Sequence, residues 1–314
     1  MSTFPTPLRT SLAAPGAILL VACYELGHQP LSLASPQATL AQAGYAPVAV
    51  DTSVTELDDE AIRAVRFVAI AVPMHTALRL GLRVAERVRA LAPNTPICFY
   101  GLYAALNADY LLREHANAII GGEYEEALLA LVRALDAIVD LTPWPPSPRG
   151  KGDELSLPVV AGVRTRTQMA GPILARLPFA VPSRETLEPP ARYAHLVRAD
   201  GSVVVAGYVE ASRGCLHTCL HCPITPVYGG RFFAVQREVV LADIRAQVQQ
   251  GVEHITFGDP DFMNGPKHSL ALVRALHEEF PQVTFDATIK VEHLIERRAL
   301  MPELAELGCA FIVS

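Results

Sequence analysis

The sequence predicts an α/β protein built from two successive arrays of alternating strands and helices. Short uncharged runs such as 17–22 and 67–72 are typical of buried strands, and segments such as 78–91 carry apolar residues at helical spacing. Strands and helices of these lengths in alternation predict parallel sheets with right-handed connections. Prolines and glycines crowd residues 142–158, which indicates a break between the two arrays.

The first array, residues 16–140, is expected to form a flavodoxin-like, doubly wound sheet. Gly44 and the pair Gly121-Gly122 fall where a helix and a strand are expected to end. We expect strands at 17–22, 47–50, 67–72, 97–100 and 118–120, and helices at 33–43, 58–65, 78–91, 106–113 and 124–139. Ligands of such sheets bind in the loops beyond the carboxyl ends of the strands.

The second array, residues 201–314, is expected to form the first part of a β/α barrel, after a Pro-rich linker and lead-in at 141–200. We expect strands at 203–209, 254–257, 283–289 and 310–313, and helices at 237–250, 270–280 and 291–307. In β/α barrels the chemistry is carried by the loops that follow the strands. These loops hold three cysteines after the first strand and four further polar residues after the next two, namely Asp259, Asp261, Lys290 and Glu292.

The three cysteines, Cys215, Cys219 and Cys222, are spaced C-x-x-x-C-x-x-C. Gly214 before them and Pro223 after them favour a loop that can wrap around one metal centre. Three thiolates leave one position of a tetrahedral or cubane site open, as a catalytic metal site requires. An iron–sulfur cluster with one free iron fits best. One alternative is a structural zinc, for which His217 and His221 in the same loop are the further candidate ligands, and a less favoured one is a disulfide.

This spacing resembles the signature of the radical S-adenosylmethionine (SAM) enzymes. The resemblance implies that the three cysteines hold a [4Fe-4S] cluster whose free iron chelates the amino and carboxylate groups of SAM. It further implies reductive cleavage of SAM to methionine and a 5′-deoxyadenosyl radical. His221 departs from the family, in which the position before the third cysteine is often aromatic.

The run 257–262, Phe-Gly-Asp-Pro-Asp-Phe, resembles the F-x-D-x-x-F stretch of radical SAM enzymes that carry a cobalamin-type domain. It occupies the place of a glycine-rich SAM-binding motif, so the resemblance implies that Gly258 and Asp259 contact SAM. Lys290 and Glu292 are further candidates, for the SAM carboxylate or ribose. The alternatives are an ordinary polar turn at Asp259 and a solvated helix start at Lys290.

The first array, placed before such a core, resembles the cobalamin-binding domain of that subfamily. The sequence lacks the D-x-H-x-x-G motif that supplies a histidine to cobalt, and His28 lies in the corresponding loop but in the wrong frame. Cobalamin is therefore a possible third cofactor, and the alternative is a domain used for packing or substrate docking. With cobalamin the resemblance implies methyl transfer to an unactivated carbon; without it, hydrogen abstraction and rearrangement.

The amino-acid composition limits the class of protein and its expected location. The chain has 314 residues, a net charge of −6 and 51% hydrophobic residues, which suits two globular α/β domains and disfavours a nucleic-acid-binding protein. No apolar run has the length of a membrane span, and the N-terminus lacks a signal pattern, so a cytoplasmic location is expected. The radical SAM resemblance implies an electron donor such as flavodoxin or ferredoxin as partner, and the sequence does not specify the substrate, a small molecule or a peptide.

The sequence ends within the apolar run 309–314, which would leave an unprotected strand at the edge of the sheet. We therefore expect a chain truncated within the radical SAM core or completed by a partner. A second hypothesis follows from this: a catalytically inactive iron–sulfur or zinc-binding fragment that acts as a docking module.

Overall fold

The computed structural model describes residues 11–139 and 157–314, which divide into two compact units. The first unit comprises the chain up to Cys23 together with Thr39–Ile173, and the second comprises Tyr24–Ala38 together with Leu174–Ser314. Of the segment expected to link them, 141–156 lies outside the described residues, 157–173 belongs to the first unit, and 174–200 belongs to the second.

The first unit is built on a six-stranded sheet in the order β2-β1-β3-β4-β5-β6. Its first five strands pair in parallel and give the order 2-1-3-4-5, so the predicted flavodoxin-like, doubly wound sheet is confirmed. They are β1 (Ile18–Ala22), β2 (Val48–Asp51), β3 (Phe67–Ala71), β4 (Ile97–Tyr100) and β5 (Ala118–Ile120). All residues of β1, β3, β4 and β5 are buried, as expected for parallel strands covered on both faces.

One strand of this sheet was not predicted. β6 (Val163–Arg164) pairs antiparallel with β5 and has only two residues, too few for a recognisable hydrophobic period. The helices are α1 (Leu31–Gln42), α2 (Asp59–Ala64), α3 (His75–Leu91), α4 (Leu102–Leu106), α5 (Ala108–Glu114) and α6 (Glu125–Val139), of which α1 crosses the division between the units. Among the described residues, no helix is long and apolar enough to span a membrane.

The second unit is built on a five-stranded sheet in the order β13-β12-β11-β8-β7. β8 (Val203–Val209), β11 (His254–Phe257), β12 (Thr284–Thr288) and β13 (Cys309–Val313) run parallel, which confirms the predicted β/α units of a partial barrel. β7 (His195–Val197) pairs antiparallel with β8 and was not predicted. A separate antiparallel pair, β9 (Ser212–Gly214) and β10 (Phe232–Ala234), was not predicted either.

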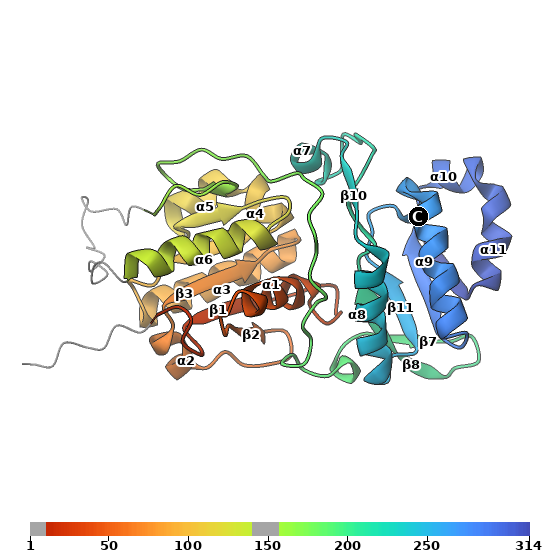
Figure 1. Ribbon diagram of the computed structural model, residues 1–314, viewed down its shortest axis with the longest axis horizontal. Helices are drawn as coiled ribbons and strands as arrows, with labels where there is room; N and C mark the ends of the chain where they lie inside the picture. Colours follow the sequence, from red (N-terminus) through yellow and green to blue (C-terminus); the bar gives the residue numbers. More distant parts are fainter. Residues whose placement is uncertain (1–10, 140–156) are drawn as a thin grey trace, which may run out of the picture. The chain divides into compact units, whose positions relative to one another are not determined.

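Two long helices, α8 (Arg237–Gln249) and α9 (Pro266–Glu279), lie side by side along this sheet (Figure 1). The single helix expected at 291–307 is instead α10 (Val291–Glu296), a 3-10 turn η3 (Arg298–Leu300) and α11 (Met301–Glu306). The remaining short elements are η1 (Pro190–Arg192), α7 (Thr225–Tyr228) and η2 (Phe262–Asn264). Phe257, Phe262 and Phe285 form the centre of the core, with ring centroids 4.7 to 6.4 Å apart.

A buried ion pair joins three segments of the second unit. Arg184 is 2% exposed and donates to both carboxylate oxygens of Asp243 on α8, at 2.6 and 2.9 Å. The same guanidinium donates to Gln29 at 2.9 Å and to the carbonyl of Tyr208 in β8 at 2.8 Å. The lead-in to the barrel and residues 24–38 are thereby held against the first β/α unit by hydrogen bonds that satisfy a buried charge.

Candidate functional site

The three cysteines lie on a loop between β9 and α7. Cys215 is buried, and Cys219 and Cys222 are partly exposed. The loop is irregular over residues 215–224, as Gly214 and Pro223 led us to expect, although the hairpin strand β9 intervenes between β8 and the loop. All three thiols are free of disulfides.

A glycine at the base of the loop is required by space and by backbone angle. Gly214 has a φ of +72°, which side chains rarely tolerate, and an added Cβ would lie 2.3 Å from the carbonyl oxygen of Arg231 and 2.5 Å from the Tyr228 ring. The backbone at the start of the cysteine loop is therefore packed so closely that only glycine fits at position 214. Three thiols on one partly exposed loop fit an iron–sulfur cluster or zinc, both of which bind thiolates.

The other three cysteines have a different environment. Burial raises the pKa of Cys23 to about 11, raises that of Cys309 to about 11, and raises that of Cys98 still further. Because metals bind the thiolate form, these residues are poor ligands at neutral pH.

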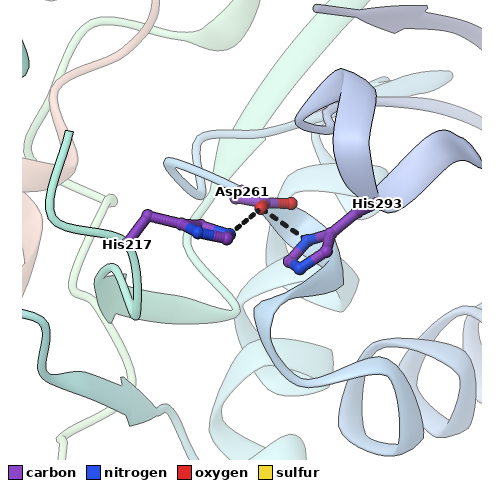
Figure 2. Close-up of side chains that lie close together, drawn as sticks. All are labelled: His217, Asp261 and His293. Atoms are coloured by element: carbon purple, nitrogen blue, oxygen red, sulfur yellow. Dashed lines mark ion pairs between the residues drawn. The ribbon is translucent and has the colours of Figure 1, made fainter. Parts of the chain in front are cut away.

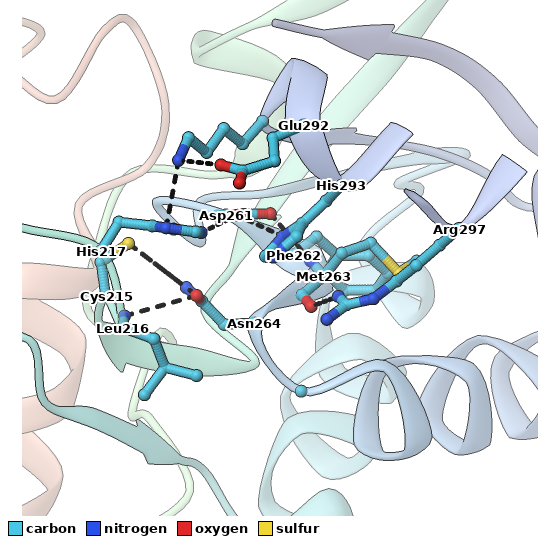
Figure 3. A network of polar contacts seen from close by, with 12 residues as sticks. Cys215, Leu216, His217, Asp261, Phe262, Met263, Asn264, Glu292, His293 and Arg297 are labelled. Carbon is cyan, nitrogen blue, oxygen red and sulfur yellow. Dashed lines mark hydrogen bonds and ion pairs between the residues drawn. The ribbon is translucent and has the colours of Figure 1, made fainter. Parts of the chain in front are cut away.

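Asn264 is a site residue that the sequence analysis missed. Its Nδ2 lies 3.5 Å from Sγ of Cys215, and its Oδ1 accepts a hydrogen bond of 3.3 Å from the backbone nitrogen of Leu216 (Figure 3). Asn264 belongs to η2, two residues beyond the run 257–262. That closeness in sequence is the only signal that could have identified it.

Asp259 supports the polypeptide that leads into the cysteine loop. Its carboxylate is 2% exposed and accepts hydrogen bonds from the backbone nitrogen of Ala211, at 2.9 Å, and from the Ser212 hydroxyl. Burial raises its pKa to about 7, against the lowering effect of these two bonds. Both oxygens are engaged with the chain itself, and the predicted SAM contact of Asp259 stays a prediction.

Gly258 has a steric reason for lacking a side chain. A Cβ there would lie 1.9 Å from the hydroxyl oxygen of Tyr208. The tight turn after β11 therefore depends on Gly258, whether or not it also contacts a ligand.

Asp261, which was expected on this face without a role, lies between two histidines (Figure 2). Its Oδ2 is 2.7 Å from Nδ1 of His293 and 3.4 Å from Nε2 of His217. His217 comes from the cysteine loop and His293 from α10. The sequence analysis named His217 only as a zinc candidate and missed His293.

Lys290 and Glu292 also reach the cysteine loop. Nζ of Lys290 lies 3.1 Å from Nδ1 of His217 and 2.5 Å from Oε2 of Glu292. The hydrogen bond between them raises the pKa of Lys290 and lowers that of Glu292. The structure thus brings Lys290 and Glu292 to the same site as Asp261 and Cys215.

His28, the weak cobalt candidate, packs its ring 5.1 Å from that of Tyr208. Burial lowers the pKa of His28, which favours the neutral imidazole. Nδ1 of His28 is buried without a hydrogen-bond partner.

The fold can be compared with solved structures. The radical S-adenosylmethionine methyltransferase TsrM from Kitasatospora setae, with cobalamin and a [4Fe-4S] cluster bound, matches 95% of this chain with a TM-score of 0.65 and 15% identity. This chain has the fold of the matched part of TsrM. A second TsrM structure, with tryptophan substrate and the SAM analogue aza-SAM, matches 94% of the chain with a TM-score of 0.61 and 15% identity.

The matched region is 58% of the length of each TsrM chain. No protein-family model matches the sequence, and no curated protein does. The match covers both the flavodoxin-like unit and the partial β/α barrel of this chain.

Proposed function

We propose that the protein binds a [4Fe-4S] cluster through Cys215, Cys219 and Cys222, and binds SAM at the free iron of that cluster. The observation that carries the proposal is the position of the cysteines. They lie in the loop between β9 and α7, after β8, which is the first parallel strand of a β/α sheet whose fold is found in TsrM. Bound in this way, the cluster supplies the electron that cleaves SAM reductively.

The surrounding residues support and position the loop. Asp259 holds the backbone nitrogen of Ala211 and the hydroxyl of Ser212 just before the loop, and Asn264 holds Cys215 and Leu216 within it. Hydrogen bonds from amide groups to cluster sulfurs tune the reduction potential. Lys290 carries a positive charge beside the loop and is the residue that we assign to the SAM carboxylate.

Cobalamin-dependent methyl transfer is the reaction class that we propose, because TsrM, a methyltransferase with cobalamin and a [4Fe-4S] cluster bound, matches 95% of this chain, including the flavodoxin-like unit. The first unit is the proposed cobalamin-binding part, although its sequence lacks the D-x-H-x-x-G motif that supplies a histidine to cobalt. The proposal includes a flavodoxin or ferredoxin as electron donor and a cytoplasmic location, where cysteine thiols stay reduced and able to bind iron.

The experiment is anaerobic reconstitution with iron and sulfide, followed by metal and sulfide analysis and a visible absorption spectrum. The account predicts about four irons and four sulfides per chain in the unaltered protein. Cys219→Ala is expected to lose the cluster, whereas Cys309→Ala is expected to keep it, since Cys309 lies in β13 outside the loop. Zinc bound by the three cysteines, with no iron retained after reconstitution, would support the docking-module alternative instead.

A further inference from the structure

Three side chains from three separate segments bring donor atoms together beside the cysteine loop. His217 lies between Cys215 and Cys219, Asp261 follows β11, and His293 belongs to α10. Nε2 of His217, Oδ2 of Asp261 and Nδ1 of His293 all lie within 4.8 Å of one another (Figure 2). The two imidazole rings are tilted by 52°, with centroids 4.8 Å apart.

These three atoms are buried and lack hydrogen bonds of proper geometry. Asp261 is 2% exposed, His293 is 7% exposed, and the three facing atoms are inaccessible to solvent. Oδ1 of Asp261 accepts a hydrogen bond of 3.1 Å from the backbone nitrogen of Met263, which orients the carboxylate. Oδ2 lies close to the two ring nitrogens, but none of these contacts has the angles of a hydrogen bond. Buried polar atoms left in this way are costly unless a ligand completes them.

We propose that His217, Asp261 and His293 bind one divalent first-row transition-metal ion, such as Zn²⁺, at a site separate from the three thiolates. Two imidazoles and one carboxylate are a donor set that Zn²⁺ and Fe²⁺ both accept, with at least one position left for water or another ligand. The site does not depend on the proposed cluster, because none of its donors is a cysteine. It also removes His217 from the set of ligands available to a zinc bound by the thiolates.

The contact between Lys290 and His217 affects metal binding at this site. Its Nζ lies 3.1 Å from Nδ1 of His217, and a histidine that binds metal through Nε2 carries its proton on Nδ1. Metal binding therefore ends that contact and requires an acceptor for Nδ1–H. On this proposal the acceptor is Glu292, whose carboxylate pairs with Lys290. Arg297, the other nearby cation, is held at the carbonyl of Met263.

The first test isolates the histidine site from the thiolates. In the Cys215→Ala, Cys219→Ala, Cys222→Ala triple variant, equilibrium dialysis against Zn²⁺ alone should give one ion per chain. Adding His293→Ala or Asp261→Asn should reduce bound zinc to background. His221→Ala is the matched control, because His221 is an exposed histidine of the same loop, and it should leave binding unchanged. Lys290→Met should tighten binding by roughly 10-fold.

A second measurement covers the case in which the triple variant does not fold. The unaltered protein is reconstituted with its cluster, loaded with Zn²⁺ and measured by zinc-edge X-ray absorption. Nitrogen and oxygen neighbours at about 2.0–2.2 Å, lost in His293→Ala while iron and sulfide stay constant, are the expected result. Sulfur neighbours at about 2.3 Å, or zinc retained in full by His293→Ala, would overturn the proposal.

Discussion

The side-chain amide of Asn264 lies against the sulfur of Cys215, with 3.5 Å between Nδ2 and Sγ. The two residues are 49 positions apart in sequence and come from the loops after two neighbouring strands of the sheet. The same amide accepts from the backbone of Leu216, so it fixes both the sulfur and the chain that carries it.

Replacing Asn264 by Ala is expected to make the reduction potential of the reconstituted cluster more negative. An amide N–H beside a ligand sulfur stabilises the more negative, reduced state, and the variant loses that interaction. A potentiometric titration followed by EPR measures the change. Leu220→Ala is the control in the same loop, because Leu220 is fully exposed, and it should leave the potential unchanged. Equal reduction potentials for Asn264→Ala and the unaltered protein would show that Asn264 does not influence the cluster.

Replacing Gly214 by Ala is expected to destabilise the loop by about 1–3 kcal/mol and to lower the yield of cluster. The added methyl group meets the carbonyl oxygen of Arg231 at 2.3 Å, and a backbone atom of the hairpin cannot move away freely. Gly229→Ala is the matched control, since Gly229 also has a positive φ, +58°, but open space around it. Iron content and urea denaturation distinguish the two. A Gly214→Ala protein that takes up as much iron as the control contradicts the steric account.

Removing the charge of Asp243 is expected to cost about 3–5 kcal/mol of unfolding free energy, because Arg184 then stays buried without its counter-ion. Asp243→Asn is the test, measured by denaturant unfolding. Glu279→Gln, which breaks the exposed pair with Arg245, should change stability little. The double replacement Arg184→Met, Asp243→Leu should recover much of the loss, since it leaves no isolated charge. If Asp243→Asn unfolds at the same denaturant concentration as the unaltered protein, the ion pair does not hold the lead-in.

The buried His28 is expected to make the protein less stable in acid. Its pKa is lowered in the folded state by burial, so below the ordinary value of 6.5 the unfolded chain takes up a proton that the folded chain does not. Its contribution is therefore present above pH 6.5 and is lost as the pH falls. His254 and Asp286 also influence this group, the first lowering and the second raising the pKa of His28.

Unfolding free energies of the unaltered protein and of His28→Phe, measured from pH 7.5 to pH 5.5, check this prediction. Phe keeps an aromatic ring against Tyr208, at the present ring distance of 5.1 Å, and cannot be protonated. The variant should lose less stability on acidification than the unaltered protein. Parallel pH profiles would mean that His28 titrates alike in the folded and unfolded states.

Much of the fold was predictable because a long buried strand is recognisable in the sequence as an uninterrupted apolar run. The run Val203–Val209 was expected as a strand and is β8 with the same bounds, and the doubly wound form of the first sheet was expected from the alternation of strands and helices. β6 and β7 were missed because two or three residues carry no usable period. The break after Glu296 was missed because residues 291–307 keep apolar residues at near-helical spacing across the 3-10 turn.

The candidate site was predictable only in part, for a different reason. The rule that loops after parallel strands share one face placed Asp261 and Lys290 near the cysteines. It could not say which side chains meet, because that depends on strand register and on the turns. His293 lies inside a helix and Asn264 inside a 3-10 turn, and neither belongs to a motif. Their roles emerge only from the distances to Asp261 and to Cys215.

The central claim is that one open iron of a three-cysteine cluster binds SAM. The most direct test is the EPR spectrum of the anaerobically reconstituted, dithionite-reduced protein, recorded with and without SAM. The account predicts the signal of a reduced [4Fe-4S] cluster that changes on addition of SAM, and no such signal from Cys219→Ala. A cluster signal that SAM leaves unchanged, or a protein that holds zinc at the thiolates and forms no cluster, would contradict it.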